Sequence, residues 1–157
     1  MVALSLGAAT GRAADTDAEV TAHQSVLDLA GAFTNDGFKL RDGNYKGTLK
    51  AGESVLVQVN LYAGNQYWFS VAAAEPKSSV SINVYDESGK LMNSEAFTTT
   101  TAPATGATPA LQPSADPYAN KNRAAAGFAP DTSGPYYVRI TETAGDAATF
   151  CLIYSYK

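Results

Sequence analysis

The sequence predicts an all-β protein, an antiparallel jelly-roll-like β-sandwich preceded by one amphipathic α-helix. Between residues 45 and 154, short runs alternate apolar and polar side chains, as strands with one buried face do. Glycine-containing turns separate these runs at the spacing expected of a sandwich of seven or eight strands. The 157 residues suit one domain, and an apolar fraction of 45% is enough for a hydrophobic core.

Residues 1–14 are expected to be a truncated secretory signal peptide. They begin with a small, apolar stretch and end at Ala14, just before an acidic segment, although the basic start of such signals is missing. This segment predicts a secreted or periplasmic protein. It is too short to span a bilayer, which takes about 20 apolar residues, and no later stretch is long enough either.

Residues 15–36 are predicted to hold the helix. Thr16 and Glu19 have the spacing of a capping box, which favours a helix that begins at Asp17. Four apolar residues then follow at helical spacing up to about Thr34: Ala22, Val26, Leu29 and Phe33. Because one helix cannot bury its own apolar stripe, we expect it to lie against the sheet or to close one end of the sandwich.

Residues 37–157 are predicted to form the sandwich. In its clearest strands every second side chain is apolar and is expected to point inward. These side chains are Val55, Val57, Val59 and Leu61; Tyr67, Phe69 and Val71; Val80, Ile82 and Val84; Tyr136, Val138 and Ile140; and Phe150, Leu152, Tyr154 and Tyr156.

The alternation stops at about residues 98–125, which are rich in Ala, Pro, Thr and Ser. Long segments of this kind inside a compact domain are usually functional or disordered. We expect a flexible insertion here, with a binding loop as the alternative.

Charge and cysteine content exclude several functions. The 11 basic and 15 acidic residues give a net charge of -4, whereas nucleic-acid binding needs clustered Lys and Arg. Cys151 is the single cysteine, so it cannot form an intramolecular disulfide and is expected to be a small buried hydrophobe. No cofactor is implied.

Three segments together resemble the bacterial pre-peptidase C-terminal domain, a jelly-roll-like sandwich found on secreted hydrolases. They are residues 49–53 (LKAGE), 84–89 (VYDESG) and 128–140 (FAPDTSGPYYVRI), and the similarity covers about residues 47–154. The resemblance implies export, no catalysis, and a role as a secretion aid, a targeting module or a binder of polymers such as collagen or polysaccharide.

The same resemblance bears on metal binding. Many members carry an Asp-x-Asp pair where this chain has Ser79 and Ser81. Calcium sites need several oxygen ligands, carboxylates foremost, so no metal is expected at that position. Asp86 remains, and a single carboxylate in a turn usually forms an Asx-type turn.

No catalytic arrangement stands out, and we predict that the protein is not an enzyme. His23 is the only histidine, and its place beside the apolar stripe of the helix favours a structural role. A carboxylate-dependent hydrolase is the weaker alternative. Its candidate acids lie at turns or strand ends, where solvated charges are common: Glu53, Asp86, Glu87, Asp131, Glu142 and Asp146.

A binding module is the stronger hypothesis. The chain has nine Tyr and one Trp, and Trp68, Tyr85 and Tyr137 fall on the outward phases of their strands. Exposed rings there can stack on sugars or anchor a protein, so polysaccharide and envelope proteins are the expected partners. Alternatively, the helix covers these rings and makes them a second small core. A third reading is a structural envelope or matrix component that assembles through sheet edges.

Overall fold

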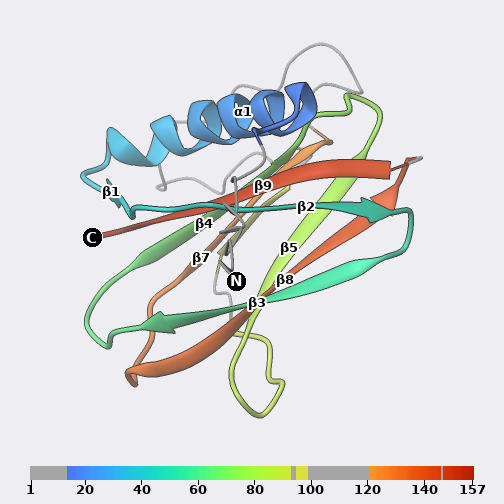
Figure 1. The fold of residues 1–157 in the computed structure, drawn as a ribbon. Coiled ribbons are helices and arrows are strands. Elements are labelled where there is room, and N and C mark those ends of the chain that lie inside the picture. The colour runs from blue at the N-terminus through green and yellow to red at the C-terminus, as the bar shows by residue number, and fades with distance from the viewer. Residues whose placement is uncertain (1–13, 93–94, 99–120, 146) are drawn as a thin grey trace, which may run out of the picture.

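The computed structural model describes residues 14–92, 95–98, 121–145 and 147–157 (Figure 1). Nearly all of the predicted signal segment and most of the predicted insertion therefore lie outside the described residues. No helix in the described part of the chain is long and apolar enough to cross a membrane.

The described elements are one helix and nine strands. Helix α1 spans Asp17–Thr34, as the sequence predicts. The strands are β1 (Lys39–Leu40), β2 (Tyr45–Lys50), β3 (Ser54–Leu61), β4 (Tyr67–Ala73), β5 (Ser79–Tyr85), β6 (Glu95–Thr98), β7 (Arg123–Phe128), β8 (Gly134–Ala144) and β9 (Ala147–Tyr156).

The strands form two antiparallel sheets that pack face to face. Sheet A has the order β1-β9-β4-β7-β6, with β2 also paired to β9, and sheet B has the order β3-β8-β5. Early strands pair with late ones in a nested order, β2 with β9, β3 with β8 and β4 with β7. This is the winding of a jelly roll, so the predicted fold class is confirmed.

Helix α1 lies across the outer face of sheet A, so the molecule has three layers (Figure 1). Its capping box is formed: the Thr16 hydroxyl accepts from the Glu19 N–H, and the Glu19 carboxylate accepts from the Thr16 N–H. The apolar stripe is buried against β4, β7 and β9, where Val26 packs near Cys151 and Phe33 packs near Trp68. The helix thereby gains the partner that its sequence requires.

The main core lies between the two sheets. The side chains that alternation places inward on β3, β4, β5, β8 and β9 all belong to it or pack against it. Strand β4 is buried on both faces, because sheet B covers one side and α1 the other. The period-two pattern therefore predicted the inter-sheet core correctly.

One boundary was wrong. Strand β7 begins at Arg123, inside the segment that the sequence predicts as an insertion up to residue 125. Its residues are small because both faces are packed: Ala124 and Ala126 face sheet B, and Ala125 lies under α1. A Cβ added at Gly127 would lie 2.9 Å from the Trp68 ring. A run of alanines carries no alternation, so this strand gave no signal.

Candidate functional site

An interrupted edge strand of sheet A builds the candidate site. Strands β1 and β2 both pair with β9, and residues 41–44 lie opposite only Ile153 and Tyr154. The two extra residues bulge away from the sheet. Gly43 has a φ of 99°, which glycine adopts without strain. The bulge is anchored where the Arg41 N–H donates to the Tyr154 carbonyl at 3.0 Å.

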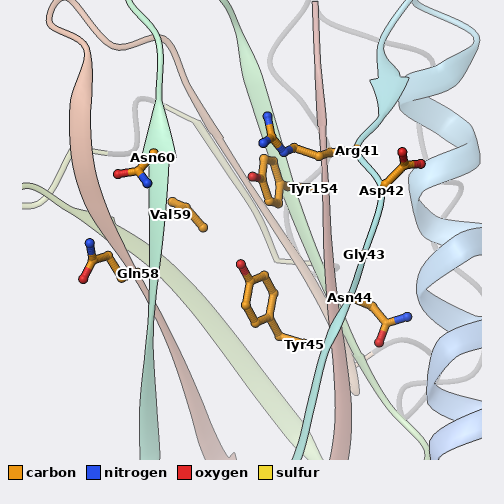
Figure 2. A pocket seen from close by; sticks show the side chains of 9 residues that line it. All are labelled: Arg41, Asp42, Gly43, Asn44, Tyr45, Gln58, Val59, Asn60 and Tyr154. Carbon is orange, nitrogen blue, oxygen red and sulfur yellow. The ribbon is translucent and has the colours of Figure 1, made fainter.

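This bulge and strand β3 of sheet B form the two walls of a cleft of about 390 Å³ (Figure 2). Its lining consists of Arg41, Asp42, Gly43, Asn44, Tyr45, Gln58, Val59, Asn60 and Tyr154. Both walls are edge strands of their sheets, so the cleft is the open side of the sandwich. Tyr154, an inner-face residue of β9, lies between the walls.

The side chains in the cleft differ in direction. Figure 2 shows Arg41, Tyr45 and Val59 pointing into the space around Tyr154, whereas Asp42 and Asn44 point toward α1. Gln58 and Asn60 point away from this space, on the other side of β3. Strand β3 therefore meets the cleft with Val59 and with its backbone edge.

The groups inside the cleft are suited to binding. The Arg41 guanidinium lies 5.9 Å from the centre of the Tyr154 ring, within the range of a cation–π contact. Burial raises the pKa of Tyr154. Among the described residues, the side chains of Arg41 and Tyr45 have no hydrogen-bond or ion-pair partner. The Arg41 guanidinium and the hydroxyl and ring face of Tyr45 are thus available to a ligand, whereas Tyr154 is buried and stacks on Phe69.

Trp68 is not available to a ligand. It is 6% exposed and stacks on Phe33 of α1, with ring centres 4.4 Å apart and planes 10° apart. The hypothesis that Trp68 is an exposed binding residue is therefore wrong, and the alternative that the helix covers the aromatic rings holds for Trp68 alone. The physical reason is that α1 needs an apolar surface and docks on sheet A.

Tyr85 and Tyr137 lie on the opposite side of the molecule from Trp68. They are paired directly across β5 and β8 on the outer face of sheet B, where both are half-buried. With Leu56 and Arg139 they line a hollow of about 410 Å³. The three aromatic residues singled out from the sequence therefore do not form one site.

The candidate catalytic residues are dispersed. His23 is half-buried on α1 and Cys151 is buried beneath it. Burial raises the pKa of the Cys151 thiol to about 11, which makes it a poor nucleophile. Within the described ranges, no three His, Cys, Asp or Glu side chains lie close enough together to hold a metal ion.

Two of the candidate acids have defined structural surroundings. Asp86 forms the expected Asx-type turn, since its Oδ1 accepts from the Ser88 hydroxyl and from the N–H groups of Ser88 and Lys90. These contacts lower the pKa of Asp86, the Ser88 hydroxyl most of all. The position of Glu142 near a strand end predicted a solvated carboxylate, and this prediction is wrong. Glu142 is completely buried on the inner phase of β8, and its carboxylate oxygens have no hydrogen bond of ordinary geometry among the described residues. Burial raises the pKa of Glu142.

The cleft residues were missed at the sequence level. Asp42 and Gly43 interrupt the alternating pattern, which indicates a turn. The interruption does not indicate which residues lie opposite that turn. Tyr154 reaches the site through pairing of β9 with strands more than 100 residues earlier, and alternation within one strand carries no such information.

No known protein-family profile matches this chain, and no curated protein sequence matches it. Among solved structures, the chain is similar to Aeromonas hydrophila PliG, a periplasmic lysozyme inhibitor of g-type lysozyme. The TM-score is 0.42 and the sequence identity is 16%, over 73% of this chain and 85% of that chain.

Proposed function

We propose that this protein is a non-catalytic binding module of the pre-peptidase C-terminal type, secreted or periplasmic. Its partner is a component of the cell envelope, either a polysaccharide or a protein. The binding site is the cleft between the edges of the two sheets. The observation that carries the proposal is that Arg41 and Tyr45 lie beside Tyr154 in this cleft and have no hydrogen-bond or ion-pair partner among the described residues.

The physical argument is that these side chains are of the kinds that contribute most to binding. Tyr and Arg are the residues that most often dominate the free energy of binding, because they combine apolar area with directed hydrogen bonds. A volume of about 390 Å³ lies within the range of ligand-binding pockets. Strand β3 and the strands that flank the bulge belong to packed sheets, which limits the backbone ordering that binding requires.

A second surface also supports a binding role. Tyr85 and Tyr137 still present half-exposed rings on the outer face of sheet B, next to Leu56, which is 61% exposed. We keep these two tyrosines as candidate ligand contacts. The cleft ranks above them because it lies between two walls and offers a cation, Arg41, that forms no ion pair with any described residue.

A pull-down test compares these two surfaces. Wild-type protein, the double variant Arg41→Gln/Tyr45→Ala and the variant Tyr137→Ala are immobilised and exposed to insoluble polysaccharides and to envelope fractions. The double variant is expected to retain about a tenth or less of the wild-type capture, as loss of a binding hot spot predicts. Tyr137→Ala is expected to capture as much as the wild type.

Equal capture by the wild type and the double variant contradicts the cleft as the site. If Tyr137→Ala alone loses capture, the binding role survives but belongs to the outer face of sheet B. Thermal unfolding of each variant confirms that loss of capture does not arise from loss of the fold.

A further inference from the structure

Among the described strands, β3 is the sheet edge with the least protection. It runs for eight residues, Ser54–Leu61, and contains no charged residue, no Pro and no Gly. Its pairing with β8 shows no shift of register. Natural proteins normally protect an edge strand with charges, Pro, a bulge or a covering segment, because an open edge recruits another strand. Strand β3 has no charged residue, no Pro and no bulge.

The edges formed by β5 and by β1 and β2 are protected. The opposite edge of sheet B is covered at several points, since the Val80 N–H donates to the Lys121 carbonyl and the Val84 carbonyl accepts from the Met92 N–H. Strand β5 also carries a register shift. On sheet A, the edge formed by β1 and β2 is interrupted by the bulge and carries Lys46 and Lys50.

The backbone groups on the free edge of β3 can be assigned from the register. The Glu142 N–H donates to the Glu53 carbonyl at 3.0 Å, and in an antiparallel ladder the direction of the backbone groups alternates along the strand. The N–H and C=O groups of Leu56, Gln58 and Asn60 therefore point away from β8. Among the described strands, β8 is the sole partner of β3.

We propose that the ligand of the cleft is an extended polypeptide segment of another protein, which adds to β3 as a further strand and places an acidic side chain against Arg41. This inference rests on the proposed function and specifies its partner. The outward backbone groups of β3, which pair with no other described strand, border the cleft at Gln58 and Asn60. A row of alternating backbone donors and acceptors complements another extended backbone, whereas sugar hydroxyls have no matching repeat.

The side chains of the added strand provide the specificity. In a strand paired with β3, every second side chain shares the inward phase of Val59 and faces Tyr45 and Tyr154. Arg41 has no ion-pair partner among the described residues, and the carboxylate of Asp42 points away from the cleft toward α1. A carboxylate in the ligand supplies the missing charge.

The test uses a phage-displayed library of random twelve-residue peptides, selected on the full chain. Selected peptides are expected to alternate β-branched residues with an Asp or Glu at a constant position. Gln58→Pro removes an outward N–H and leaves the ladder with β8 intact, so it is expected to weaken peptide affinity about tenfold or more. Gln58→Ala, the matched control, keeps the N–H and is expected to bind as the wild type does.

A second measurement remains informative if Gln58→Pro fails to fold. Each selected peptide is synthesised with single N-methyl groups along its length and titrated against the wild type. Strand addition predicts that N-methylation weakens binding at every second residue and not at the residues between. Arg41→Gln is expected to remove the preference for Asp or Glu, whereas Arg139→Gln, outside the cleft, is expected to keep it.

Four outcomes overturn the inference. One is peptide binding that neither Gln58→Pro nor N-methylation affects. The second is displacement of the selected peptides by soluble oligosaccharides, together with a lack of selected acidic residues. The third is a dimer of the wild type in light scattering that Gln58→Pro dissociates, because a second copy then occupies the edge. If the cleft variants lose envelope capture and no peptide is selected, the proposed function stands and strand addition fails.

Discussion

The outer faces of the two sheets carry the same sequence signal and have opposite surroundings. Trp68 on sheet A and Tyr137 on sheet B both occupy the phase of their strand that points away from the inter-sheet core. Trp68 is buried under α1, whereas Tyr137 is half-exposed beside an exposed Leu56. Alternation therefore predicts which side chains leave the shared core, but it does not predict which outer face gains a further layer.

The largest effect is expected from removing the covered ring. Trp68→Ala should lower the free energy of unfolding by about 3–5 kcal/mol, because it empties a fully packed site between α1 and sheet A. Tyr137→Ala should cost about 1 kcal/mol or less, since it loses mainly a cross-strand pair. Urea unfolding of both variants measures the difference, and equal losses would contradict the distinction between the faces.

A smaller effect is expected from adding a methyl group beneath the helix. The Cβ in Gly127→Ala would lie 2.9 Å from the Trp68 ring, and this overpacking should cost about 1–3 kcal/mol. Gly134→Ala on β8 is the matched control, because nothing lies within 4 Å of its added Cβ. Thermal unfolding should rank Gly127→Ala well below Gly134→Ala. The reverse order would show that α1 packs loosely.

The helix start offers a third test of the covering layer. Thr16→Ala removes the hydroxyl that caps the Glu19 N–H and should cost about 1 kcal/mol. Thr21→Ala is the comparison, since its hydroxyl donates only to the Asp17 carbonyl within the helix and Ala is the better helix former. Circular dichroism during thermal unfolding reports both variants. A neutral Thr16→Ala would mean that tertiary packing alone fixes the start of α1.

The smallest effect concerns the inner face of sheet B and depends on pH. Burial raises the pKa of Glu142 in the folded protein, so the folded state holds the proton more tightly than the unfolded state. Stability should therefore fall as the pH rises from the ordinary pKa of a glutamate toward the raised value, and stay lowered above it.

Glu142→Gln removes this dependence. The variant should gain stability relative to the wild type at pH 7.5 and little at pH 4, and the gain should be modest because the amide is also left without partners. Chemical unfolding at the two pH values measures it. Glu53→Gln, at an exposed carboxylate, serves as the control. A wild type that becomes more stable between the two pH values relative to Glu142→Gln would contradict the burial of an uncompensated carboxyl.

Much of the fold could be predicted because its signals are local. The Thr16–Glu19 pair set the start of the helix, and the period of two in β3, β5 and β8 assigned each inward side chain. Strand β7 was not predicted, because Ala124, Ala125 and Ala126 give it no alternation of apolar and polar residues. Small side chains are needed on both of its faces, since Trp68 packs on one and sheet B on the other. The cleft could not be predicted from the sequence for a different reason. Arg41, Tyr45 and Tyr154 meet through pairing between the two ends of the chain.

The buried Cys151 under α1 makes it possible to measure how often the helix separates from sheet A. Cys151 packs against Ala22, Val26 and Ala30, and with a thiol pKa of about 11 it carries almost no thiolate near neutral pH while α1 is docked. A thiol-reactive dye should therefore label the native protein only as fast as α1 lifts off sheet A. The rate of labelling of the unmutated protein reports how often α1 opens. Comparison with the rate of global unfolding shows whether the helix opens by itself.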